Sequence, residues 1–169
     1  MPGSLLGDAF THHVWATECL FDACGGLSPD QLEASAAGTY GSIIATLRHL
    51  VSSDRWYLSF FPSGQGLGAI DEQTDAGLDE LRAAMAVNGA AWTELLKGDL
   101  DPDQDIVEID NGWEVHSPLG LRLAQVIHHG TDHRSQVCTA LTALGVTPPE
   151  IDAWDYAGSR GLVTETPPR

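Results

Sequence analysis

The chain has 169 residues, 43% of them hydrophobic, so we expect a single domain over residues 1–169 with one continuous core. Its 24 acidic residues outnumber 8 basic ones, and the net charge of −16 argues against nucleic-acid partners and against docking on anionic membranes. We find neither a signal peptide nor an apolar run that could span a membrane, and three cysteines without a CxxC pair fit reduced thiols, so we expect a cytoplasmic protein.

Four helical segments are predicted, separated by loops rich in glycine, proline and aspartate. The first begins at a capping serine and ends at a pair of glycines, and the second closes before a Gly-rich loop. The third is rich in alanine with leucines at helical spacing, and the fourth is stopped by a glycine before two prolines. Their expected ranges are 4–24, 40–61, 75–97 and 119–144.

A short extended segment lies between the third and fourth helices. In DIVEIDNGWEVHS, the residues Asp110, Asn111 and Gly112 separate two β-prone runs, which indicates a small hairpin or an extended loop. Four helices of about 20 residues, joined partly by long loops, predict an all-α four-helix bundle with this hairpin or loop between its third and fourth helices.

The fourth helix carries three histidines within VIHHGTDHRSQV. At about 100° per residue its apolar residues gather on one side, and His129 and His133 lie at an edge of that side, four residues apart. Imidazoles at this spacing can approach one ion from the same direction. His128 falls on a different face, so we expect it to face solvent or an interface.

A third ligand for such an ion must come from another helix. In the second helix, His49 shares its face with small or hydroxyl-bearing residues and one tryptophan, and this face leaves room for an ion, a water or a ligand: Ser42, Ala45, Thr46, Ser52, Ser53 and Trp56.

A structural role for these histidines competes with a metal site. A chain with seven histidines often contains an i, i+4 pair by chance, and a single histidine on a helix is more often hydrogen-bonded than ligating. The zincin pattern HExxH is absent, because Gly130 follows His129 where the glutamate would stand. Spacing alone leaves both interpretations open.

Two segments of the chain resemble the DinB-like superfamily, which is related to the YfiT-like metal proteins and thiol-dependent S-transferases. They are GSIIATLRHLVSSDRWYL and HHGTDHRSQVCTALTALGVTPPEID, which match an early helix with one histidine before leucine and a late HxxxHRxQ helix ending in GxxPP. The resemblance extends from HHVWA in the first helix to DAWDY near the end of the chain. It implies a four-helix bundle that holds a metal ion through His49, His129 and His133.

One divalent metal ion is therefore the expected cofactor. An all-histidine shell favours zinc or nickel, with iron, copper or manganese as alternatives. Three imidazoles leave a coordination position open, which distinguishes a catalytic site from a structural one. An ion held in this way lowers the pKa of water or keeps a thiolate deprotonated.

Three residues on the two ligand helices are candidates for the pocket or for orienting the ligands. Trp56 shares the face of His49, and Gln136 lies nearly on the face of His129. Arg134 flanks the second histidine of the pair, where it either contacts a substrate or forms a solvated pair on the helix.

Two polar residues lie on apolar helix faces. His13, in the first helix, either lines the cavity or is a hydrogen-bonded core histidine. Asp54, in the second helix, stands among apolar residues, so we expect an arginine or an imidazole beside it.

The function predicted from these features is that of a metal-dependent enzyme acting on a small-molecule substrate. It transfers a low-molecular-weight thiol to an electrophile or hydrolyses a substrate with metal-activated water; the alternative is a binding or sensor protein whose metal serves stability or ligand capture. An acidic surface disfavours anionic thiols, so we expect an arginine patch near the cavity mouth, drawn from Arg48, Arg55, Arg82, Arg122 and Arg134. Exposed apolar helix faces and the pairing habit of the family predict a homodimer.

Overall fold

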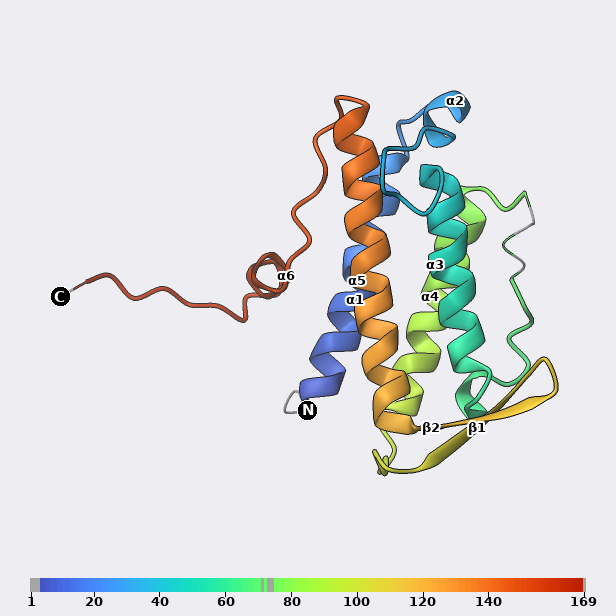
Figure 1. Cartoon of the computed structure of the whole chain (residues 1–169). Coiled ribbons are helices and arrows are strands. Elements are labelled where there is room, and N and C mark those ends of the chain that lie inside the picture. The colour runs from blue at the N-terminus through green and yellow to red at the C-terminus, as the bar shows by residue number, and fades with distance from the viewer. Residues whose placement is uncertain (1–3, 71, 73–74, 169) are drawn as a thin grey trace.

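The computed structural model describes residues 4–70, 72 and 75–168. Within them the fold is mainly helical, as the sequence predicts, with six α-helices, a short 3-10 helix and one two-stranded sheet (Figure 1). The elements are α1 (Leu5–Cys24), α2 (Pro29–Leu32), α3 (Ile43–Leu58), η1 (Pro62–Gly64), α4 (Leu78–Leu95), β1 (Asp105–Asp110), β2 (Trp113–Pro118), α5 (Leu119–Ala143) and α6 (Ala153–Ser159).

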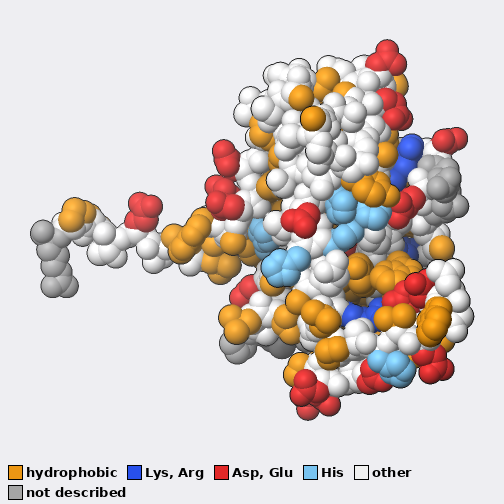
Figure 2. Space-filling view, viewed as in Figure 1, with side chains coloured by type: hydrophobic (Ala, Val, Ile, Leu, Met, Phe, Trp, Pro, Cys, Tyr) orange, Lys and Arg blue, Asp and Glu red, His pale blue; other side chains and the backbone are white. Residues whose placement is uncertain are grey.

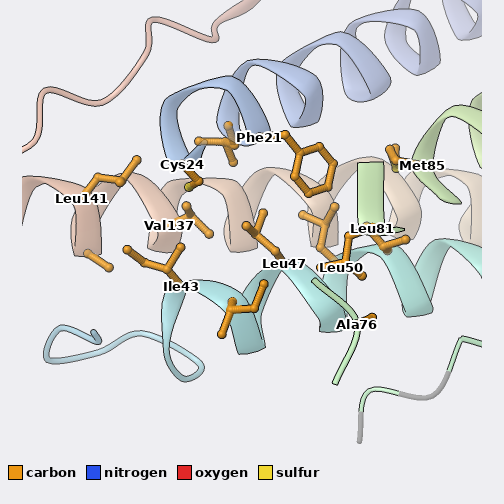
Figure 3. Close-up of a cluster of buried hydrophobic side chains, with 14 residues drawn as sticks. Phe21, Cys24, Ile43, Leu47, Leu50, Ala76, Leu81, Met85, Val137 and Leu141 are labelled. Atoms are coloured by element: carbon orange, nitrogen blue, oxygen red, sulfur yellow. The ribbon is translucent and has the colours of Figure 1, made fainter. Parts of the chain in front are cut away.

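The four long helices lie side by side around a common interior. Helix α1 packs against α4 and α5, and α3 also packs against α4 and α5 (Figure 1). One cluster of buried apolar side chains joins all four helices and includes Phe21, Leu47, Met85 and Val137 (Figure 3). A second cluster, nearer the hairpin, is built around Trp92 and its apolar neighbours. Burial of these apolar faces is the main term that holds the helices together.

The helix ends follow local capping signals, and two helices are shorter than predicted. Ser4 caps α1 as expected, because its Oγ accepts the N–H of Gly7 at 2.9 Å. Helix α3 begins only after its own cap, Ser42, rather than at Tyr40. It ends before Phe61, which takes the extended conformation favoured by a following proline. Helix α4 starts after Gly77, so the third helix is also shorter than its predicted range.

The segment predicted to be a small hairpin or an extended loop forms a hairpin. Strands β1 and β2 are antiparallel, with Asp110 paired to Trp113 across a two-residue turn. Both turn residues have positive φ, 47° at Asn111 and 83° at Gly112, as a type I′ turn requires. Strand β2 leads directly into α5, so the hairpin determines where the helix with the paired histidines begins.

Two short helices were not predicted. Helix α2 lies where a turn was expected and is closed by a reciprocal capping box between Ser28 and Gln31. Helix α6 is capped by Asp152, and beyond it the chain runs away from the body of the protein (Figure 1). Within the described part of the chain, none of the helices combines the length and hydropathy needed to cross a membrane.

Candidate metal centre

His49 of α3 meets His129 and His133 of α5, and we call these residues the histidine triad. One ligand nitrogen of each lies within 4.8 Å of those of the other two. The Nε2 atoms of His49 and His129 are 3.0 Å apart. Figure 2 shows histidine side chains reaching the surface in the region of α5 and α3. The structure therefore brings together the three histidines that the sequence singled out.

The geometry of the histidine triad fits a divalent metal ion. Zinc bonded to imidazole nitrogens at 2.0–2.1 Å in tetrahedral geometry separates those nitrogens by about 3.4 Å. This value lies between the 3.0 Å that separates the Nε2 atoms of His49 and His129 and the 4.8 Å within which all three nitrogens lie. In addition, Nδ1 of His133 is buried and has no hydrogen-bond partner among the described residues. Buried polar atoms are nearly always paired, so this orphaned nitrogen also fits a site that binds a cation.

The electrostatic environment keeps two of the imidazoles neutral. Burial, followed by charge repulsion from His133 and His49, lowers the pKa of His129 to about 4. Burial, followed by charge repulsion from His49, also lowers the pKa of His133. Neutral imidazoles carry the lone pair that a metal ion needs, so both side chains are in the ligating form at pH 7.

Glu72, in the loop before α4, lies behind His49. Its Oε1 accepts a hydrogen bond from Nδ1 of His49 at 2.8 Å, which leaves Nε2 of His49 with the lone pair that faces the triad. Burial by itself raises the pKa of Glu72, but hydrogen bonds from His49, Tyr40 and Ser52 and the charge of His49 outweigh burial, and the pKa lies below its ordinary value. Sequence reasoning missed this residue, because nothing local distinguishes it from the other acidic residues.

Tyr40 covers the histidine triad from the loop before α3. Its ring stacks on that of His49 with centroids 4.2 Å apart, and it meets His133 edge-on at 5.3 Å. Oε1 of Gln136 accepts the backbone N–H of Tyr40 at 2.8 Å. Gln136, a predicted orienting residue, therefore holds this loop against α5. The sequence predicted Tyr40 as the first residue of a helix, so its position in a loop beside the triad was missed.

A cleft of about 730 Å³ adjoins the histidine triad. Ser52 and Trp56 of α3 form part of one wall, and residues 64–70 together with Glu72 contribute the other. Trp56 thus lies where the sequence placed it, on the His49 side of α3. Because Glu72 both lines the cleft and bonds His49, a small molecule in the cleft would lie near the histidine triad.

His13 and Arg134 lie elsewhere, in what we call the interior polar cluster (His13, Asp54, Trp92 and Arg134). His13 is fully buried; its Nε2–H donates to Asp54 at 3.0 Å, and its Nδ1 accepts from Nη1 of Arg134 at 2.9 Å. Trp92 Nε1 donates to the same carboxylate at 3.2 Å. The structure thus places His13 in the core rather than on a cavity wall, and Asp54 has the imidazole partner that its position predicted.

Gly130 allows this cluster to form beside the triad. A Cβ at this position would come within 2.4 Å of Cε1 of His13 and 2.8 Å of Nη1 of Arg134. Gly130, which stands where the zincin pattern HExxH has its glutamate, is therefore the residue that lets His13 approach α5.

A patch at the cavity mouth was expected to draw on five arginines, and among the described residues that line the cleft one of the five is present. Arg55 does line the cleft, but its guanidinium donates to Asn88 and to the carbonyls of Leu67 and Gly68. The others bond backbone or side-chain partners within the fold: Arg48 with Ala76, Arg82 with Glu18 and Asp22, Arg122 with Glu108, and Arg134 with His13.

Comparison with protein families assigns the chain to a family. The family model described as the DinB family matches residues 1–166. This range includes the four long helices, the hairpin and all three histidines of the triad. The search of curated proteins returned no match.

Proposed function

Because the chain belongs to the DinB family, we propose that it binds one divalent metal ion through His49, His129 and His133. The observation that carries this proposal is the convergence of three imidazole nitrogens from two helices within 4.8 Å. The same premise supports assigning the four long helices to the four-helix-bundle class, with α1 and α3 each packed against α4 and α5.

The proposed chemistry combines a metal ion with the groups around it. A divalent ion supplies Lewis acidity, which favours the deprotonated forms of water and thiols at neutral pH. Glu72 orients His49, and Tyr40 shields the outer face of its ring. Zinc and nickel suit the donor set best.

We favour an enzyme over a purely structural metal site. The support is the cleft of about 730 Å³, a volume typical of small-molecule sites, which shares Ser52 and Glu72 with the surroundings of the triad. The proposed reaction transfers a low-molecular-weight thiol to an electrophilic small molecule or hydrolyses a small-molecule substrate. The second candidate is a non-catalytic binding or sensor protein, which the same centre would serve.

Elemental analysis tests the metal site. Protein purified without a nickel column is expected to contain about one divalent ion per chain, and the single variants His49→Ala, His129→Ala and His133→Ala are expected to lose it. His128→Ala is the matched control, because this exposed histidine lies on the same helix. Full metal content in both His129→Ala and His133→Ala would reject the assignment.

Cobalt-substituted protein tests the reaction. Thiolate ligation produces a charge-transfer band that water does not, so cysteine, mycothiol and bacillithiol are each added and the absorption spectrum is recorded, followed by assays with an electrophilic acceptor. A band together with turnover supports thiol transfer. Neither band nor turnover with any thiol would favour the hydrolytic or binding function.

We also propose that the protein forms a homodimer. Support comes from large apolar side chains that remain exposed on and beyond α6, namely Trp154, Leu162 and Val163. Light scattering at micromolar concentration is expected to give twice the mass of one chain, and a single-chain mass would reject the dimer.

A further inference from the structure

The carboxylate of Glu72 collects hydrogen bonds from three side chains. Oε1 accepts from Nδ1 of His49 at 2.8 Å and from the hydroxyl of Ser52 at 3.2 Å. Oε2 accepts from the hydroxyl of Tyr40 at 3.1 Å. These donors come from α3 and from the loop that precedes it, so one loop residue is joined to two other parts of the chain.

These contacts determine which nitrogen His49 offers to a metal. A neutral imidazole carries one proton, and a carboxylate at Nδ1 places that proton there and leaves the lone pair on Nε2. Nε2 is the atom that faces His129 at 3.0 Å. The ring of Tyr40 stacks on that of His49, and its hydroxyl donates to the carboxylate of Glu72. The same two residues therefore fix both the ring plane and the tautomer of His49.

Glu72 also belongs to the wall of the cleft. The loop that forms this wall is bonded at Leu67 and Gly68 by the guanidinium of Arg55. At its other end the loop is bonded through Glu72 to Ser52 and to a ligand of the triad. The hydrogen bonds of Glu72 that orient His49 therefore also fix this end of the cleft wall.

We infer that Glu72 is a positioning residue that orients His49 for metal binding and couples occupancy of the histidine triad to the order of the cleft wall. The inference rests on the proposed metal site. Carboxylates behind ligating histidines raise ligand basicity and fix ring orientation, and their removal typically weakens metal affinity 10–100-fold.

Zinc affinity, measured by competition with a chelator, tests the first half. Glu72→Ala is expected to bind zinc about 10–100-fold more weakly than the wild type, and Glu72→Gln to fall between them, because its amide oxygen still accepts from Nδ1–H without the charge. Glu80→Ala removes the same charge from an exposed position of α4 and is expected to keep wild-type affinity. Equal affinities in the wild type and Glu72→Ala would overturn the positioning role.

The tautomer of His49 gives a readout that needs no metal. Nitrogen-15 NMR of the metal-free wild type is expected to show His49 protonated at Nδ1, and Glu72→Ala is expected to show a mixture of tautomers, whereas His128 is unchanged. An unaltered His49 tautomer in Glu72→Ala would overturn the inference. A wild type that binds no zinc but shows this tautomer change would reject the proposed function and retain the orientation of His49 by Glu72.

Hydrogen exchange tests the coupling to the cleft. Zinc is expected to slow backbone exchange over residues 64–70 in the wild type and in Glu80→Ala, and to have little effect there in Glu72→Ala at saturating zinc. Equal slowing in Glu72→Ala would show that the wall responds to the metal without Glu72, and would overturn the coupling.

Discussion

Two polar clusters in the described part of the chain, the interior polar cluster and the histidine triad, both draw on α3 and α5, but their polar atoms are satisfied in different ways. In the interior polar cluster every donor faces an acceptor: His13 donates to Asp54 and accepts from Arg134, and Trp92 donates to the same carboxylate. In the histidine triad, ligand nitrogens face one another, and one buried nitrogen has no partner among the described residues.

This difference shows that burial by itself does not identify a functional histidine. His13 is fully buried, yet its two nitrogens are matched and its role is structural. The triad is less buried, but it brings imidazole nitrogens that can act as acceptors close to one another. Such nitrogens need a shared proton or a bound cation between them. Helix α5 serves both clusters with adjacent residues, because successive side chains point about 100° apart: His129 and His133 face the triad, and Gly130 and Arg134 face the interior.

The largest expected effect is on the interior polar cluster. Asp54→Ala leaves the buried N–H groups of His13 and Trp92 without their acceptor, and each buried donor left unsatisfied costs about 1–3 kcal/mol. Urea denaturation of metal-free protein measures this change. His129→Ala is the contrast and is expected to cost much less, and a cost for Asp54→Ala below that of His129→Ala would remove the distinction between the two clusters.

The triad is expected to stabilise the fold only when metal is present. Zinc at 100 times its dissociation constant adds about 2.7 kcal/mol to the free energy of unfolding, since it binds the folded state alone. This increment should vanish in His133→Ala and persist in His128→Ala, as measured by denaturation with and without zinc. An increment that survives in His133→Ala would show that zinc binds elsewhere.

Gly130→Ala tests how closely the two clusters approach. Alanine is about 1 kcal/mol better than glycine within a helix, so the substitution would stabilise α5 if there were room. The close approach to His13 predicts instead a net loss of about 1–3 kcal/mol from overpacking. Gly158→Ala, at a position with no atom within 4 Å of the added carbon, is the control. A stability gain in Gly130→Ala would contradict the close approach.

The smallest effect is expected at an exposed imidazole, which serves as the reference for both clusters. A hydrogen bond to Asp105 at 2.7 Å, together with its charge, raises the pKa of His116 above 6.5. Because the folded pKa lies above the unfolded one, the stabilisation is complete below about pH 6.5 and is lost as the pH rises through the folded pKa. An NMR titration of His116 measures the midpoint, which should fall in Asp105→Asn; an unchanged midpoint would refute the pairing.

Much of the centre was predictable because its pattern is local. The i, i+4 spacing of His129 and His133 puts both on one helix face whatever else the chain does, and the small residues around His49 marked the complementary face of α3. Asp54 was recognisable as a carboxylate in need of a partner, although the sequence left open whether an arginine or an imidazole would supply it.

The positions of the arginine side chains could not be predicted, because the charge of a residue does not indicate which partners it meets in the fold. A patch near the cleft mouth was expected to draw on these five arginines, but a guanidinium has five donors and bonds backbone carbonyls readily, as Arg55 and Arg48 do. Tyr40 and Glu72 were missed for a related reason: each reaches the triad from a loop, and loops carry no periodicity that would point their side chains.

The sequence by itself determined the four long helices, the turn at Asn111 and Gly112, and which histidines share a face, because these follow from backbone periodicity and conformational preference within a few residues. Only the tertiary structure decided which face of α3 meets which face of α5, since that depends on how the buried apolar side chains of all four long helices pack. That packing sends His13 to Asp54 and Arg134 in the interior and brings Glu72 to His49 at the surface. The difference between the interior polar cluster, whose donors and acceptors are matched, and the histidine triad, whose nitrogens converge, is thus a product of packing, because groups far apart in the chain meet only when the helices dock.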